Sequence, residues 1–123
     1  AKIGVDNSTV VTSIDYKLRN KVKVYNSGWF AVAQNKGYSK SHGLGVVPDL
    51  VQIWYSETSD GSGDVTMVGN AMWDANTCTM LSDVTASAIS LWCPSYVADY
   101  KDSAGTRRQR TSGYLRVVAI KFN

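Results

Sequence analysis

The chain contains one histidine, two cysteines and two prolines among its 123 residues, and each scarcity removes a class of protein. Two cysteines are too few for a disulfide-based scaffold, and Cys78 and Cys93 lack the CxxC spacing of a zinc site. They pair if they lie on adjacent strands, and otherwise they are two buried free thiols. With His42 as the sole imidazole, a catalytic triad has one candidate base, and no nucleophile elbow accompanies it.

Long apolar runs are also missing. No segment approaches the roughly 18–20 apolar residues that cross a bilayer, and the chain does not open on a charged-then-apolar signal segment. Hydrophobic residues make up 44% of the chain and charged residues 19%, which suits one folded domain. The sequence therefore predicts a soluble protein that does not insert into a membrane.

Signatures of phosphate binding, metal binding and catalysis are absent as well. The glycines at 61 and 63 have neither the lysine nor the helix that follow in a phosphate-binding loop. Asp60 and Asp64 flank them without EF-hand spacing, so a flexible turn is the simpler interpretation. The acidic residues lie mostly in loops, and nothing in their spacing pairs two of them as a glycosidase requires. We therefore predict a protein that is not an enzyme and uses no cofactor.

The net charge of +3 comes from basic residues concentrated at 17–23 and 107–110. A balance of this size can attract nucleic acid or an anionic surface, but a solvated face and a solvated loop explain it more simply. We expect no nucleic-acid partner.

Short runs of β-branched and aromatic residues alternate with glycine-rich and polar segments along most of the chain. This spacing is typical of antiparallel strands joined by turns. The pattern predicts an all-β fold, an antiparallel β-sandwich or barrel of about six or seven strands. The expected strands are 28–34, 49–57, 65–73, 77–81, 85–93 and 114–122, and the expected polar loops are 58–64 and 102–113.

The first 26 residues differ from the rest. Apolar side chains there fit both a period of two and a helical stripe, so strand and helix remain equal alternatives. We interpret residues 1–26 as a short stalk or arm, followed by a domain over 27–123.

Two of the expected strands are apolar on both faces. In 114–122 one face holds Arg116, Val118 and Ile120, and the other holds Leu115, Val117 and Ala119. The strand beginning at Leu50 repeats this arrangement, although a two-layer sandwich needs only one apolar face per strand. The outward face is therefore expected to meet another chain, or else a covering loop.

The lone histidine lies in YSKSHGLGVVPDL, between two of the expected strands. It lacks local partners for a metal, so a metal role would need three copies to converge on the axis of a trimer. The simpler interpretation is structural: His42 bonds the turn, Gly43 and Gly45 supply unusual backbone angles, and Pro48 starts the next strand.

SGWFAVAQNKGYSKSHGLGVVPDLVQIWYSET, together with the closing GYLRVVAIKF, resembles a module at the C-termini of bacteriophage tail-fibre proteins. The resemblance spans residues 27–123. The module is similar to the H-type lectin sandwich, an antiparallel fold that assembles as trimers. It implies a virion protein, a homotrimeric tip that follows an upstream fibre segment and binds a host glycan or outer-membrane component. A purely structural fibre-closing module and a cellular H-type lectin are the alternatives.

Sugar sites combine aromatic faces with Asp, Asn and Arg side chains that bind hydroxyl groups. Segments 70–77 and 92–102 and the arginines of the following loop offer this chemistry, whereas Trp29 and Trp54 are expected in the core. The candidate receptor contacts are Asn70, Trp73, Asp74, Asn76, Tyr96, Asp99, Tyr100, Arg107, Arg108 and Arg110.

Overall fold

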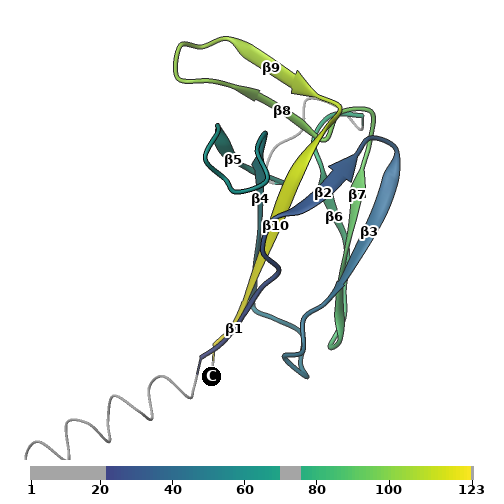
Figure 1. The fold of residues 1–123 in the computed structure, drawn as a ribbon. Helices are drawn as coiled ribbons and strands as arrows, with labels where there is room; N and C mark the ends of the chain where they lie inside the picture. Colours follow the sequence, from purple (N-terminus) through teal and green to yellow (C-terminus); the bar gives the residue numbers. More distant parts are fainter. Residues whose placement is uncertain (1–21, 70–75, 123) are drawn as a thin grey trace, which may run out of the picture.

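The computed structural model describes residues 22–69 and 76–122, and these residues form ten strands and no helix (Figure 1). Consequently, no helix in this part of the chain is long and apolar enough to cross a membrane. The strands are β1 (Lys23–Asn26), β2 (Phe30–Ala33), β3 (Lys36–Ser41), β4 (Leu50–Ser56), β5 (Val65–Val68), β6 (Met80–Val84), β7 (Ala88–Cys93), β8 (Ala98–Lys101), β9 (Arg107–Arg110) and β10 (Ser112–Lys121).

All strand pairs are antiparallel and form three sheets. The largest has the order β1-β10-β4-β5, and β2 also pairs with β10, on the edge that β1 uses. The second sheet has the order β3-β7-β6, and β8 pairs with β9 as a separate hairpin. Figure 1 shows the two larger sheets facing each other, with the β8–β9 hairpin projecting from one end beside β5.

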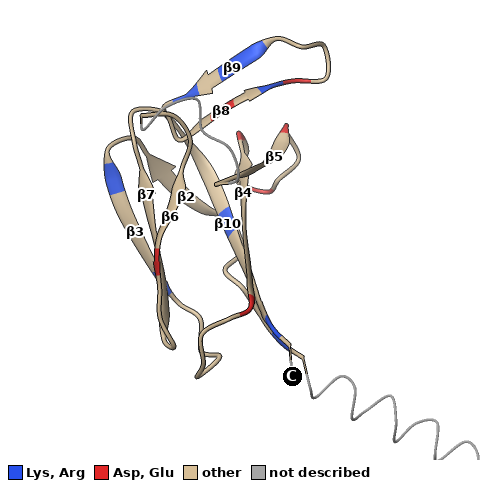
Figure 2. Cartoon of the chain, turned by 180° about the vertical axis from the view of Figure 1, so that it is seen from behind, with Lys and Arg blue, Asp and Glu red and all other residues tan. Residues whose placement is uncertain are grey.

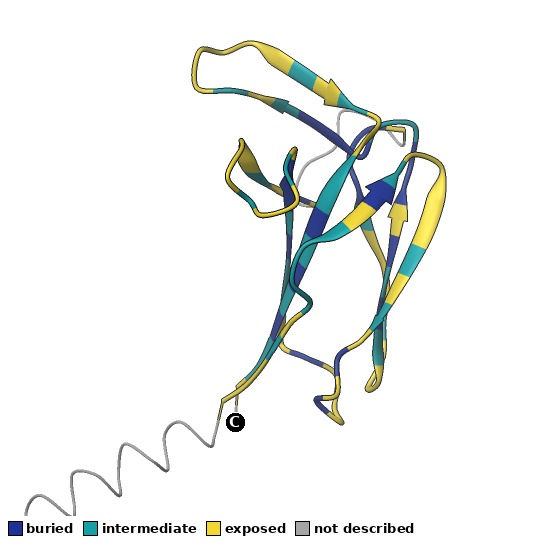
Figure 3. Ribbon diagram, in the orientation of Figure 1, coloured by how far each residue is buried: buried dark blue, intermediate teal, exposed yellow. Residues whose placement is uncertain are grey.

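One apolar core lies between the two larger sheets. Alternate residues of β10, namely Leu115, Val117 and Ala119, are each 0% exposed, and they meet Ile89 and Leu91 of β7 in the same cluster. Figure 3 shows this alternation as buried bands along β10 and β7, whereas the hairpin is mostly exposed. The alternation predicted for 114–122 is confirmed, because side chains of a strand point to opposite faces in turn.

The aromatic ring of Tyr55 closes this core beneath β10. Its hydroxyl donates a hydrogen bond of 2.8 Å to the carbonyl oxygen of Ser112. The next residue, Gly113, has φ +151°, and a Cβ atom there would lie 2.5 Å from the Tyr55 hydroxyl oxygen. The two strands approach this closely only because position 113 has no side chain.

The predicted all-β, antiparallel class is confirmed, but the number of strands is larger than about six or seven. Residues 36–41, expected as part of a turn segment, form β3, and Arg107–Arg110, expected in a polar loop, form β9. The β9 hairpin lies largely outside the core, so its strands carry no apolar alternation that sequence could show.

Several strand boundaries also differ from the expected ones. The strand predicted over 65–73 is β5, which ends at Val68 before Gly69 with φ +89°. The strand predicted over 77–81 begins only at Met80, since Cys78 has φ +64° and is not extended.

The N-terminal arm lies mainly outside the described residues, at 1–21. Its last residues, however, form β1, which pairs with β10 from Lys23↔Lys121 to Asn26↔Val118. The larger sheet therefore begins within the segment that sequence assigned to the arm.

We expect Gly113→Ala to lower the free energy of unfolding by about 3 kcal/mol, because the added methyl group overlaps the buried, hydrogen-bonded Tyr55. Urea denaturation measures this loss. Gly105→Ala is the matched control, since Gly105 has φ +81° but nothing within 4 Å of its Cβ position. It should lose only the backbone part, about 1 kcal/mol; equal losses in the two variants would refute the steric argument.

Candidate functional site

The segment around His42 is a tightly bonded turn. The ring is buried, with 4% of the residue exposed, and Nε2 lies 2.8 Å from the carbonyl oxygen of Thr85. Nδ1 accepts a hydrogen bond of 3.1 Å from the backbone N–H of Leu44, so Nε2 carries the proton and donates it to Thr85. Gly43 and Gly45 have φ of +67° and +78°, angles that favour glycine, and Pro48 is buried. Both ring nitrogens are thus engaged within the chain.

The two cysteines lie among polar neighbours in the core. Both are free thiols, so the disulfide alternative is not observed. The Sγ of Cys78 accepts a 3.2 Å hydrogen bond from the N–H of Asp99, and burial raises the pKa of both thiols. Thr79 contacts the Sγ of Cys93 at 3.4 Å. These contacts place the cysteines in the packing of the core.

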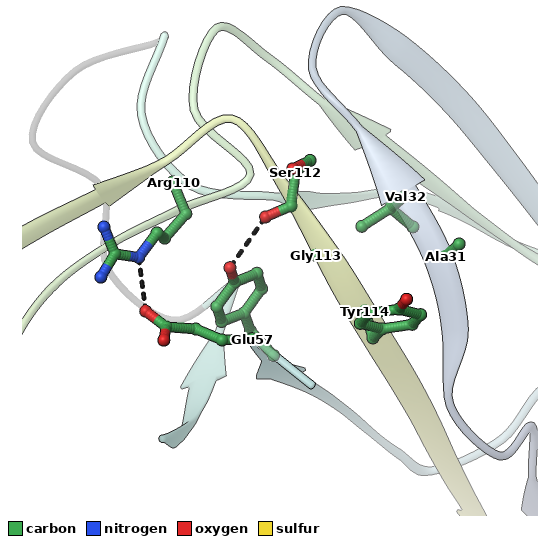
Figure 4. A pocket seen from close by; sticks show the side chains of 8 residues that line it. Ala31, Val32, Glu57, Arg110, Ser112, Gly113 and Tyr114 are labelled. Atoms are coloured by element: carbon green, nitrogen blue, oxygen red, sulfur yellow. Dashed lines mark hydrogen bonds and ion pairs between the residues drawn. The ribbon is translucent and has the colours of Figure 1, made fainter. Parts of the chain in front are cut away.

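A cavity of about 520 Å³ opens where the hairpin joins the larger sheet (Figure 4). Its wall combines one acidic side chain, one basic side chain and two tyrosines with the backbone of β10. The lining residues are Ala31, Val32, Tyr55, Glu57, Arg110, Ser112, Gly113 and Tyr114.

Two strands bring the polar side chains of this pocket together. Tyr55 comes from β4, Glu57 follows the end of that strand, and Arg110 is the last residue of β9. Nε of Arg110 donates to Oε1 of Glu57, and both side chains are about one third exposed, at 34% and 35%. The pair is therefore open to solvent and to a ligand.

Electrostatics in the pocket follow from burial and from this ion pair. Burial, and next the negative charge of Glu57, raise the pKa of Tyr55 to about 12. The Glu57 carboxylate also raises the pKa of Arg110 by accepting its hydrogen bond. Both shifts keep the Tyr55 hydroxyl and the Arg110 guanidinium protonated at neutral pH.

Tyr100 connects the hairpin to this pocket. Its ring centroid lies 6.3 Å from that of Tyr55, and its hydroxyl donates to Oε1 of Glu57 at 3.4 Å. Burial raises the pKa of Tyr100, and the Glu57 charge adds to the effect. Two of the sequence-predicted contacts, Tyr100 and Arg110, are thus brought together at one site.

The other hairpin candidates are engaged in ion pairs of their own. Figure 2 shows basic residues along β9 of this hairpin. Arg107 bonds both carboxylate oxygens of Asp99, at 2.9 and 2.6 Å, and the Asp99 side chain is fully buried. Arg108 donates to Asp102 at 3.0 Å and leaves 41% of its side chain exposed. Asp99 therefore secures the hairpin and offers no free carboxylate, whereas the arginines still expose one edge.

The remaining sequence candidates lie elsewhere. The N–H of Tyr96 donates to the carbonyl oxygen of Asn76 at 3.2 Å, and neither residue is among those that line the pocket. Asn70, Trp73 and Asp74 lie outside the described residues.

Sequence reasoning missed Tyr55, Glu57 and Tyr114 as site residues. Tyr55 and Glu57 stand two positions apart at the end of a strand, a spacing that places both on one face. That signal was present, but their partner Arg110 is 53 positions along the chain, and only folding brings the two together.

The arrangement suits binding of polar hydroxyl-bearing or charged groups. Among residues 22–69 and 76–122 no group of three or more His, Cys, Asp or Glu side chains could hold a metal ion. Of the residues that line the pocket, only Glu57 carries a carboxylate.

No protein-family model matches the chain, and no curated protein matches it.

We expect Asp99→Asn to destabilise the protein by about 2 kcal/mol at pH 7, because it breaks an ion pair whose carboxylate is fully buried. The Arg107 hydrogen bonds hold the pKa of Asp99 below its usual range, so this stability is present above about pH 4 and disappears as pH falls through the lowered value. Urea denaturation at pH 7 and near pH 2 measures this: the free energies of unfolding of Asp99→Asn and the unmodified protein should differ at pH 7 and converge near pH 2. The exposed Asp83→Asn serves as control, and a pH-independent Asp99→Asn difference would contradict the ion-pair account.

Proposed function

We propose that this protein is a trimeric, non-catalytic tip domain of a bacteriophage tail fibre, a β-sandwich that binds a glycan or another component of the host surface. The observation that carries the proposal is the open Glu57–Arg110 pocket at the root of an arginine-bearing hairpin that projects from the sheets. Projecting loops on a rigid sheet scaffold are common positions for recognition sites. The resemblance of residues 27–123 to tail-fibre modules supplies the biological setting.

The side chains of this pocket match the chemistry of a sugar. Arg110 and Glu57 can bind neighbouring hydroxyl groups, while Tyr114 and Tyr100 contribute aromatic surface. Arg107 and Arg108, each 41% exposed, extend the basic surface along the hairpin toward anionic sugars or phosphate. Binding at such a site needs no bond to be broken, in accord with a non-catalytic role.

The proposed trimer interface is the outer face of the larger sheet. Strand register places Trp54, Gln52 and Leu50 opposite Arg116, Val118 and Ile120 on that face. Several apolar side chains there are exposed, including Val24 at 60%, Leu50 at 39% and Met67 at 39%. An apolar sheet face of this kind is typical of a surface that another chain covers.

Arg116 lies at the centre of the same face. Its guanidinium carbon is 5.0 Å from the ring centroid of Trp29, and its Nε is buried without a hydrogen-bond partner among the described residues. Buried polar atoms without partners are rare in folded proteins. Because Nε is already covered within a single copy, this atom does not itself report on contact with another copy. Trp29 and Trp54, expected in the core, are half-buried instead, Trp54 on this face and Trp29 against Arg116.

This outer face also favours a second candidate, a structural module that closes the fibre without touching a receptor. Such a module would need the apolar face but not the open ion pair of the pocket. The two functions therefore differ in what substitution of Arg110 does.

We expect Arg110→Ala to weaken binding to host cells or to an immobilised host glycan about tenfold, since it removes the only cation lining the pocket. Fluorescently labelled protein on a glycan array and on host cells measures this. Lys101→Ala, which removes an exposed positive charge elsewhere on the hairpin, is the matched control and should bind normally. Absence of any binding by the unmodified protein would favour the structural module.

We expect Leu50→Asp to convert the trimer to monomers, because it places a charge in the proposed interface. Leu81→Asp is a closely matched control: Leu81 is 40% exposed, against 39% for Leu50, but lies in the other sheet. Sedimentation velocity measures the assembly state. A monomeric unmodified protein, or equal dissociation of both variants, would overturn the proposed interface.

A further inference from the structure

The outer face of the β3-β7-β6 sheet carries a second concave surface, separate from the pocket at the hairpin. It is a cavity of about 540 Å³ that Trp92 of β7 helps to line. The indole is unusually open for a tryptophan in a central strand, with 42% of the residue exposed. The lining residues are Gly37, Tyr38, Ser39, Met80, Ser82, Ser90, Leu91 and Trp92.

Trp92 is flanked by residues of both adjacent strands. Register places Gly37 of β3 directly opposite Trp92, and a Cβ at position 37 would lie 3.6 Å from the Cε3 atom of the indole. This is an ordinary van der Waals distance, so the indole lies against the backbone of β3 at this glycine. On the other edge Met80 of β6 is opposite Trp92. Trp92 thus lies between β3 and β6, and part of it remains open to solvent.

Three serines line the same cavity as the exposed ring. Ser39 and Ser90 are directly opposite each other on this face, and Ser82 comes from β6. Within the part of the chain that the structure describes, these three side chains make no hydrogen bond. They are therefore available as donors and acceptors to a ligand beside the indole.

No charged side chain lines this cavity. An anionic ligand would find no cation in this lining, which favours a neutral ligand, although the exposed Asp83 of β6 is opposite Ser90 in register. A pyranose ring has an apolar C–H face that suits an indole and a rim of hydroxyl groups that suits serines. Neutral sugars are therefore the ligand class that these residues fit.

We propose that the Trp92 surface is a binding site for a neutral pyranoside, separate from the Glu57–Arg110 pocket. The C–H face of the sugar stacks on the indole, and its hydroxyl groups bond Ser39, Ser82 and Ser90. This site does not depend on the pocket at the hairpin, since it lies on the other sheet and shares no lining residue with it.

The test uses methyl α-glucopyranoside and methyl β-galactopyranoside as probes, with saturation-transfer NMR and tryptophan fluorescence as readouts. The unmodified protein should bind at least one of them in about the millimolar range. Trp92→Ala should weaken that binding about tenfold or more, and the Ser39→Ala, Ser90→Ala double variant severalfold. Binding should also be insensitive to salt, because no charge takes part.

Leu81→Ala is the matched control, since it removes an apolar side chain of similar exposure, 40% against 42%, from outside the cavity. Arg110→Ala should leave methyl glycoside binding unchanged, which separates this site from the proposed receptor pocket. Failure of both glycosides to bind, or equal binding by Trp92→Ala, overturns the proposal. A change of sedimentation in Trp92→Ala also overturns it, because the face would then be an interface between copies.

Discussion

The pairing of β10 with β4 is the constraint on which the rest of the structure depends. Strand β10 is bonded to β4 along one edge and to β1 and β2 along the other, so both of its edges are used. Its inward residues, among them Leu115 and Val117, are fully buried in the core. A shift of one residue in this register would exchange the two faces of the strand. The same register therefore determines the core and the apolar face proposed to meet another copy.

Tyr55 links the core to the candidate site, because it packs against β10 and also lines the pocket. Its ring fits against β10 only because Gly113 has no side chain, and its hydroxyl bonds the neighbouring carbonyl of Ser112. Two positions further on, Glu57 leaves the end of β4 and meets Arg110. The pocket is thus an extension of core packing, and the ion pair of Arg107 with the buried Asp99 holds the hairpin that supplies its cation.

The sequence predicts what depends on local alternation and fails where tertiary contacts decide. The residues that share each face of 114–122 could be predicted from the alternation of side chains, because one side of that strand is buried in the core. Strand β9 could not, since Arg107–Arg110 is stabilised by ion pairs with residues of other segments and shows no apolar pattern. For the same reason sequence found Arg110 but not its partner Glu57, and it did not place Trp92 on an open face.

The two proposed binding surfaces differ in chemistry and in position, and the difference bears on how a trimer would use them. Copies that assemble through the outer face of the larger sheet would leave the opposite face, with Trp92, directed outward in each copy. A neutral sugar site of this kind binds weakly on its own, because few polar contacts and one aromatic ring supply its energy. Several weak sites on one rigid assembly gain affinity through effective concentration rather than through new contacts. The charged pocket would then supply selectivity and the neutral surface would prolong residence on a glycan-covered cell.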